Sequence, residues 1–179
     1  MHRKDGSKIL VEMVCNHLHG HLYHLTDETH MTSIEEHGLL SDRARRELGI
    51  VPAFPGGNGL SQTLDADRGL DDMVFLSFFN MGVMPKHDDA RRRRPILLRI
   101  DARALFLRGA KVALGRANRQ NTNIYSAAGA FDKMDWEVIS GEVNDTNVSI
   151  HQRWRIFEVC DYEVLVPNRV PIEYILGRA

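Results

Sequence analysis

The chain has 179 residues, a hydrophobic fraction of 43% and a charged fraction of 26%. This length and composition are typical of one soluble globular domain, so we expect residues 1–179 to share a single core. No apolar run approaches the ~18 residues of a membrane span, and the charged N-terminus lacks the apolar region of a signal peptide. We therefore expect a cytoplasmic protein, in which Cys15 and Cys160 are buried thiols and not a disulfide scaffold.

The formal net charge of −1 conceals a strong asymmetry along the chain. Residues 91–119 contain 10 Lys or Arg against 1 acidic residue, whereas residues 1–90 contain 8 against 14 and residues 120–179 contain 5 against 9. The basic segment opens with a run of four arginines, Arg91, Arg92, Arg93 and Arg94. Such a run alone is typical of a solvated loop, but the basic residues that follow it equally support a surface that binds the phosphates of a dinucleotide or a nucleic acid.

Near the N-terminus, residues 9–17 and 18–25 are predicted to form an exposed strand or hairpin. Strand alternation would place His17, His19 and His21 on one face, a spacing that suits a metal ion. Three close histidines on one strand rarely complete a tetrahedral site unaided, however, and no second cluster of ligands follows. We therefore predict a hairpin without a metal.

The stretch Tyr23–Thr26 alternates apolar and polar side chains, which predicts a strand with His24 and Thr26 on one face. The polar residues after it supply the chemistry of a helix start, and Gly38 is a typical helix stop. Strand, short helix and Gly-Leu is therefore the predicted order.

Further elements follow along the chain. Residues 41–48 have a helical pattern, and the Pro- and Gly-rich sequence after them predicts a mobile loop up to residue 72. The run Met73–Phe79 predicts a buried strand whose one polar side chain is Ser77. Pro95–Asp101 predicts another strand, followed by a short helix or turn.

The last third of the chain has three recognisable patterns. Residues 131–139 have helical spacing, and residues 150–159 fit an edge strand with Trp154 on one face. Tyr162–Pro167 is a second β-type run with Glu163 inside it. A lone acidic residue within a strand favours a functional explanation, although an edge-strand acid that faces solvent is the plainer alternative.

The order of four motifs resembles the NAD-dependent ADP-ribosyltransferase superfamily: His24-x-Thr26, Ile34-x-x-x-Gly38-Leu39, Val74-Phe75-Leu76-Ser77 and the late Glu163. Within it, the stretches 70–75, 131–136 and 162–166 resemble the DarT family, which attaches ADP-ribose to thymidine in single-stranded DNA. The resemblance runs from about Tyr23 to Ile175. It implies an α+β fold: a split, mostly antiparallel sheet of about six to eight short strands, with few flanking helices and a central cleft for NAD.

The resemblance also implies roles for individual residues. Glu163 would stabilise the oxocarbenium-like ribose that forms when nicotinamide leaves, and His24 with Thr26 would orient NAD. Three further cofactor contacts are expected, from Ser77, Phe78 and Asn118. The arginine that assists catalysis in DarT enzymes has two candidate counterparts, Arg68 and Arg46.

The acceptor is expected to contact residues outside the NAD site. In these enzymes the segment ahead of the catalytic Glu recognises the target, and Arg153, Trp154 and Arg155 suit a stacked base and its phosphate. The run 91–94 would extend that path, and the glycine-rich loop 56–59 would close over NAD. An antitoxin partner and a toxin-antitoxin role also follow from the resemblance.

Three alternatives remain open at this point. An RNA 2′-phosphotransferase has a similar His-x-Thr start and a similar ending, but it needs no such Glu. A protein-directed mono-ADP-ribosyltransferase would use the same site on another acceptor. A nucleotide-binding module would keep the fold without turnover.

Overall fold

The structure is a computed structural model that describes residues 6–51, 59–80, 94–141 and 149–179. Seven α-helices occur in these residues: α1 Gly6–His17, α2 Met31–His37, α3 Asp42–Glu47, α4 Gly59–Asp67, α5 Ala127–Ala130, α6 Trp136–Ile139 and α7 Ile150–Cys160. The strands are β1 His21–Asp27, β2 Leu39–Leu40, β3 Met73–Ser77, β4 Pro95–Asp101, β5 Lys111–Ala113, β6 Ile124–Ser126, β7 Glu163–Pro167, β8 Arg169–Val170 and β9 Ile175–Arg178. Short 3-10 turns are η1 Glu28–His30, η4 Ala102–Phe106, η5 Phe131–Lys133 and η6 Ile172–Tyr174.

The strands form a seven-stranded sheet in the order β6-β5-β7-β3-β1-β4-β9, and β2 and β8 form a small second sheet. Every pairing is antiparallel. β1 and β4 are paired along their whole length, but β1 and β3 share the single register pair Tyr23↔Ser77. The sheet is therefore split into two halves that meet at this point, which confirms the predicted α+β fold with a split antiparallel sheet.

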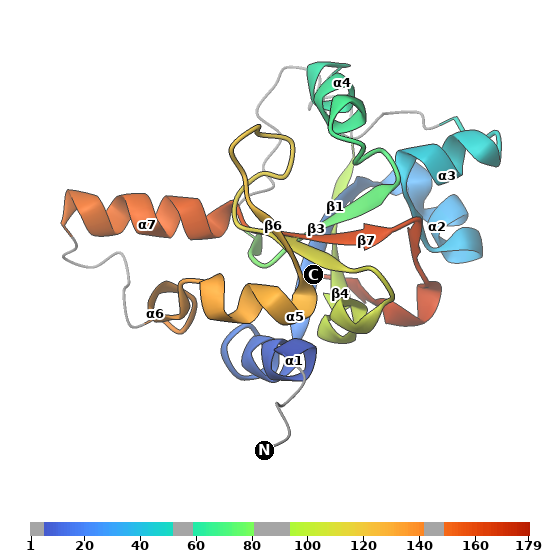
Figure 1. Cartoon of the computed structure of the whole chain (residues 1–179). Coiled ribbons are helices and arrows are strands. Elements are labelled where there is room, and N and C mark those ends of the chain that lie inside the picture. Colours follow the sequence, from blue (N-terminus) through green and yellow to red (C-terminus); the bar gives the residue numbers. More distant parts are fainter. Residues whose placement is uncertain (1–5, 52–58, 81–93, 142–148) are drawn as a thin grey trace.

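One face of the sheet carries the main core. Fully buried Leu22, Leu98 and Val164 point to this face and pack with Leu10 and Val14 of α1. Helices α1 and α5 lie side by side against this face, whereas α4 lies on the opposite side of the sheet (Figure 1). A smaller apolar cluster, which includes Leu70, Met73 and Leu165, fills the α4 side.

The predicted strand, short helix and Gly-Leu unit is present. Asp27 ends β1 and caps η1 by accepting hydrogen bonds from the Thr29 amide at 3.0 Å and the Thr29 hydroxyl at 2.7 Å. Gly38 ends α2 with a positive φ of 78°. A Cβ there would lie 2.3 Å from the carbonyl oxygen of Val170, so only glycine allows β8 to approach this closely.

The predicted strand over residues 9–17 is wrong, because this segment is helix α1. Its buried side chains Leu10, Val11 and Val14 follow helical spacing. His17 therefore ends a helix while His21 begins β1, and the two do not share one strand face. No group of three or more His, Cys, Asp or Glu in the described part of the chain could hold a metal ion. Cys15 is exposed and not buried as expected.

The loop predicted between residues 48 and 72 is partly wrong. Residues 52–58, with most of the glycine-rich stretch, lie outside the described residues. Residues 59–67 form α4, because this segment contains no proline and its one glycine is the first helical residue. The breakers are thus confined to the sequence before the helix.

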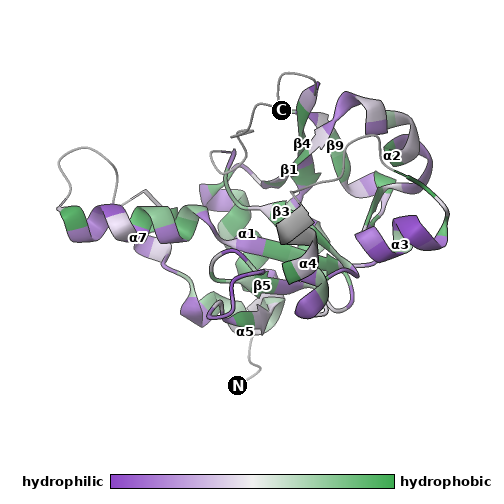
Figure 2. Cartoon of the chain, turned by 90° about the horizontal axis from the view of Figure 1, so that it is seen from above, coloured by the Kyte–Doolittle hydropathy of each residue, from purple (hydrophilic) through white to green (hydrophobic). Residues whose placement is uncertain are grey.

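The edge strand predicted for residues 150–159 is also wrong, because the segment forms α7. Ser149 caps it with a reciprocal capping box to Gln152. The helix projects away from the body of the protein (Figures 1 and 2). Its exposed apolar side chains, Ile150, Trp154 and Phe157, recur at helical spacing, which period-2 counting did not detect. No helix in the described residues is long and apolar enough to cross a membrane.

Candidate active site

Glu163 begins β7 in the interior of the sheet and not at an edge. Its Cα pairs with those of Ser77 on β3 and Ala113 on β5, and Ser77 pairs with Tyr23 on β1. Paired residues of antiparallel strands point to the same face. Tyr23, Ser77 and Glu163 therefore form one row across the point where the two half-sheets meet.

The surroundings of Glu163 disfavour the ionised form of its carboxyl group. The backbone amide of Ala117 donates a hydrogen bond to Glu163 Oε2 at 2.7 Å. Burial raises the pKa of Glu163 to about 7, with a further upward effect from Asp65 and Asp161, although the Ala117 amide and Arg116 oppose the shift. A carboxyl with this pKa titrates near neutral pH, which is unusual for a structural acid and typical of a catalytic one.

Asp65 of α4 faces Glu163 and was missed at the sequence level, because its segment was taken as a loop. Burial raises the pKa of Asp65 to about 6, and a hydrogen bond from the side chain of Asn118 opposes this effect. The Oδ1 atom of Asp65 is buried and has no hydrogen-bond partner among the described residues. Asn118, predicted to bind cofactor, thus lies near Glu163 through its contact with Asp65.

Ser77 and Phe78 have separate environments. The Ser77 hydroxyl donates a hydrogen bond to the carbonyl of Phe79 at 2.8 Å and accepts one from the Phe79 amide at 3.2 Å. This places a small polar side chain beside Glu163. Phe78 is fully buried in the main core, so its side chain supports the sheet and offers no surface to a ligand.

His24 and Thr26 line a cavity of about 210 Å³. Strand alternation turns both away from the face of Tyr23, towards the side covered by α2, β2 and α3. Ile34 and Arg45 belong to the same lining. His24 and Thr26 therefore share one face of the sheet and line the same cavity, whereas Glu163 and Ser77 belong to the row of Tyr23, which points to the opposite face.

His24 links the two half-sheets. Its Nδ1 donates a hydrogen bond to the carbonyl of Phe75 on β3 at 2.9 Å, because a carbonyl can only accept. Burial lowers the pKa of His24, and the nearby positive charge of Arg45 adds to this effect. The ring is thus neutral near pH 7 with its proton on Nδ1, and Nε2 is left as an acceptor suited to a hydroxyl group.

Arg45 is a cavity residue that the sequence did not single out. Its guanidinium pairs with Asp42, and its buried Nε has no hydrogen-bond partner among the described residues. Burial lowers the pKa of Arg45, although an arginine remains charged. The cavity therefore contains a half-satisfied cation, a feature suited to a phosphate. Arg45 differs from the neighbouring arginines of α3 only in its position on the face of the helix that lines the cavity.

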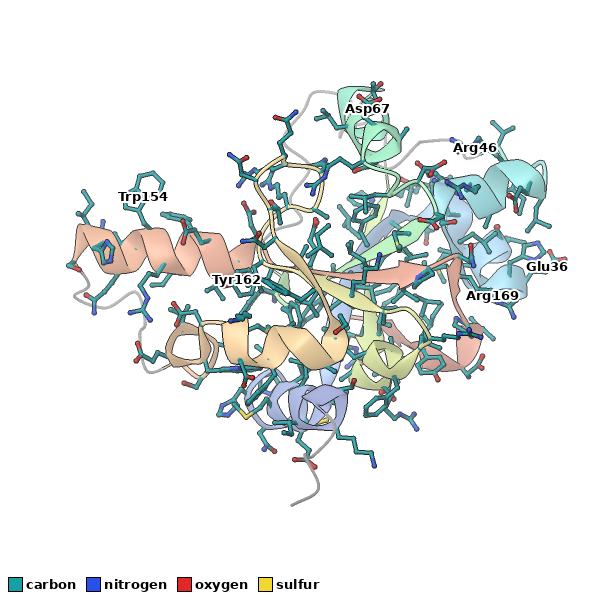
Figure 3. The ribbon with its side chains drawn as sticks, viewed as in Figure 1. Glu36, Arg46, Asp67, Trp154, Tyr162 and Arg169 are labelled. Carbon is teal, nitrogen blue, oxygen red and sulfur yellow. The ribbon has the colours of Figure 1, made fainter. Side chains whose placement is uncertain are left out.

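The two arginines proposed to assist catalysis are both engaged elsewhere. Arg46 Nη2 bonds to Asp71 Oδ2 at 2.6 Å, and Figure 3 shows its side chain on the outside of α3. Arg68 donates to backbone carbonyls of Ala117, Arg119 and, at 3.4 Å, Thr122. Neither guanidinium is directed at Glu163 in this structure.

The residues predicted to bind nucleic acid are only partly grouped. Arg91, Arg92 and Arg93 lie outside the described residues, and Arg94 is exposed, 3.6 Å from Glu28. On α7, Arg155 pairs with Asp135 at 2.8 Å and Glu137 at 2.7 Å. Arg153 and Trp154 are exposed, and Figure 3 shows the Trp154 ring pointing outwards from the helix. Trp154 is therefore accessible for stacking, while Arg155 is neutralised by its partners.

Comparison with known proteins identifies the family. The model for the single-stranded-DNA thymidine ADP-ribosyltransferase DarT matches residues 23–177. This chain belongs to the DarT family. DarT enzymes are NAD-dependent ADP-ribosyltransferases, so the chain is an enzyme that uses NAD as co-substrate. The sequence-level resemblance is confirmed.

Solved DarT structures share the fold at low sequence identity. Thermosipho africanus DarTG in complex with ADP-ribose is 17% identical, with a TM-score of 0.56, over 87% of this chain and 42% of that chain. Thermus sp. 2.9 DarT in complex with NAD+ is 14% identical, with a TM-score of 0.53, over 87% of this chain and 79% of that one. The same enzyme in complex with ADP-ribosylated single-stranded DNA gives the same TM-score and identity over 78% of its length. Comparison with curated proteins gives no match.

Proposed function

We propose that the chain transfers ADP-ribose from NAD to thymidine in single-stranded DNA with Glu163 as the catalytic carboxylate. The observation that supports this role is the raised pKa of Glu163, which reflects its burial in the centre of the sheet beside the split. When nicotinamide leaves, positive charge develops on the ribose, and a fixed carboxylate beside it stabilises that charge. The same carboxylate accepts the proton that the attacking group of thymidine loses.

We propose that NAD passes through the split in the sheet, from the face of His24 and Thr26 to the face of Glu163. One end would occupy the cavity, with His24 Nε2 and Thr26 as hydrogen-bonding groups and Arg45 as a partner for phosphate. The nicotinamide ribose would lie beside Glu163 and Ser77. In this arrangement His24 and Thr26 contact a different part of NAD from Glu163, because they point to one face of the sheet and Glu163 points to the other.

The proposed function also includes the domain organisation, the location and the partners of the protein. Residues 1–179 form one domain in this proposal, because the seven-stranded sheet joins His21 near one end to Arg178 near the other. The proposed acceptor, single-stranded DNA, is an intracellular molecule, so we place the enzyme in the cytoplasm. Trp154 and Arg153 on α7 would contact the DNA, and an antitoxin would protect the host from the activity.

Labelled NAD offered to wild type and Glu163→Gln tests this proposal. Single-stranded DNA, RNA and a protein mixture serve as separate acceptors, and released nicotinamide is measured in parallel. We expect labelled DNA and free nicotinamide with wild type, and neither with the variant. Labelling of protein alone would overturn the DNA acceptor, and no nicotinamide release from wild type with any acceptor would overturn catalysis.

A further inference from the structure

The loop of residues 114–123 is tied to α4 by the side chain of Arg68 and by the hydrogen bond between Asn118 and Asp65. Arg68, directly after α4, donates hydrogen bonds to three carbonyls of this loop, those of Ala117, Arg119 and Thr122. A guanidinium has five N–H donors in a rigid fork, so it can satisfy several carbonyls that no other single side chain would reach together. Arg68 is therefore the centre around which the loop is folded.

The loop also has internal hydrogen bonds and ion pairs, and these do not involve the Ala117 carbonyl that Arg68 binds. The Thr122 hydroxyl donates to the carbonyl of Arg116 at 2.7 Å, which closes the loop on itself. Arg116 and Arg119 pair with Asp161, at 3.0 and 3.2 Å, through exposed side chains that contribute little. Of the three carbonyls held by Arg68, that of Ala117 belongs to the residue whose amide contacts Glu163.

Ala117 connects Arg68 with the catalytic carboxylate. Its carbonyl accepts from Arg68, and its amide donates to Glu163 Oε2 at 2.7 Å. One residue of the loop is thus held on one side by Arg68 and supplies the amide on the other. A shift of the loop by about an ångström would lengthen this bond beyond hydrogen-bonding distance.

We propose that Arg68 is a positioning residue: it holds the 114–123 loop so that the Ala117 amide stays hydrogen-bonded to Glu163 and keeps this carboxylate ionised and aligned. The inference rests on the proposed role of Glu163, and it gives Arg68 a part in the reaction without contact to substrate. Arg68 therefore acts through Ala117.

Several groups compete for the protonation of Glu163. Asp65 from α4 and Asp161 from the turn before β7 favour the protonated form, as does burial, while the Ala117 amide and Arg116 favour the ionised form. Ser77 faces Glu163 from β3 without a charge. Loss of the Ala117 hydrogen bond removes the strongest group that favours ionisation. Because the reaction needs the carboxylate, activity would then require a higher pH.

The test is the pH profile of nicotinamide release by full-length Arg68→Gln. We expect the acidic limb to move up by roughly one pH unit, with kcat reduced at pH 7 and KM for NAD little changed. Arg119→Gln is the matched control, since it removes one positive charge from the same loop but leaves the carbonyl that Arg68 binds. A profile of Arg68→Gln that superimposes on wild type, or an equal shift in Arg119→Gln, would overturn the inference.

Two further variants keep the test decisive. Arg68→Lys retains the charge and replaces Arg68→Gln if that variant does not fold. Because its ammonium group reaches fewer carbonyls, we expect a smaller upward shift of the acidic limb. A pH profile identical to that of wild type would contradict the proposal. Asp65→Asn removes an opposing charge and should move the limb down. NMR titration of the Glu163 carboxyl carbon measures the same shifts without turnover, so the inference can fail while nicotinamide release, and with it the proposed function, stands.

Discussion

The two halves of the sheet provide opposite environments for a ligand. In the β1-β4-β9 half, His24 is neutral, hydrogen-bonded and directed into a cavity beside Arg45. In the β6-β5-β7-β3 half, Glu163 is buried with Asp65 nearby, and both carboxyls have raised pKa values. A neutral, hydrogen-bonded histidine beside a cation suits the binding of NAD, whereas carboxyls that titrate near neutral pH suit catalysis. In our proposal, the half that contains the cavity binds NAD and the half that contains Glu163 cleaves it.

The largest expected effect comes from the chemical half. Glu163→Gln keeps the shape of the side chain and removes its charge, so transfer should fall by at least ~100-fold, as for loss of one preorganised electrostatic group. NAD affinity, measured by calorimetry, should change little because the cavity lies in the other half. Full transfer activity in this variant would remove Glu163 from the mechanism.

The pH dependence of wild type should follow the same residue. Because the pKa of Glu163 is raised to about 7, the active carboxylate is lost as the pH falls below that value. We expect nicotinamide release at saturating NAD to drop by roughly tenfold per pH unit between pH 6 and pH 5. NAD binding should stay flat above pH 7, because burial lowers the pKa of His24 below its ordinary value and the ring is neutral there. A flat activity profile from pH 5 to 8 would contradict this assignment.

Substitutions on α7 are expected to weaken acceptor binding without affecting NAD cleavage. Trp154→Ala should weaken binding of single-stranded DNA by roughly 1–3 kcal/mol if a base stacks on the ring. Ile150→Ala is the matched control for loss of exposed apolar surface on the same helix, because Phe157 packs edge-on against the Trp154 ring. Fluorescence anisotropy measures the binding, and NAD hydrolysis without DNA should survive both changes. Equal losses in the two variants would indicate a general apolar contact and not stacking on Trp154.

The pH dependence of the free energy of unfolding should show how much the buried charge of Glu163 destabilises the folded protein. The pKa of Glu163 is higher in the folded state than its ordinary value, so its contribution to stability is fully present below about pH 4.5 and is lost as the pH rises through 7. Glu163→Gln avoids this loss and should raise the free energy of unfolding at pH 8 by on the order of 2 kcal/mol. At pH 4.5 the two proteins should be nearly equal. A variant less stable than wild type at pH 8 would argue for a structural role of the carboxylate.

The smallest effect is expected in the binding half. His24→Ala should weaken NAD binding by about tenfold, because it removes one hydrogen-bonding group of the cavity. The bond from His24 to Phe75 joins the two half-sheets, so a loss of about 1 kcal/mol in stability is expected as well. His21→Ala, on the opposite face of β1, is the control. If stability collapsed while NAD affinity stayed unchanged, His24 would be structural only.

The sequence predicted the strands well, because alternation and apolar runs are local signals. β1, β3, β4 and β7 were placed within a residue or two of their bounds, and the order of motifs identified the family. The helices α1, α4 and α7 were assigned wrongly: two were taken as strands, and breakers before the third predicted a loop. The sequences of α1 and α7 have helical spacing of apolar residues, but such short, mixed segments also fit the alternation of a strand.

The site was only half predictable, for a physical reason. His24, Thr26 and Glu163 lie in strands with recognisable motifs, so their chemistry could be proposed in advance. Asp65 and the Ala117 amide act on Glu163 from segments that lie far from it in the sequence, and no local pattern encodes such contacts. Arg68 was proposed as an assisting arginine from the family resemblance, whereas the positioning role proposed here rests on the carbonyls that it binds.

A crystal structure of Glu163→Gln with NAD tests the central claim most directly, because the variant should bind NAD without cleaving it. The account predicts a ligand that crosses the split, with one end in the cavity beside His24 and Thr26 and the nicotinamide ribose beside residue 163. It would be contradicted by NAD lying wholly within one half of the sheet, with the cavity empty or residue 163 out of reach of the ribose.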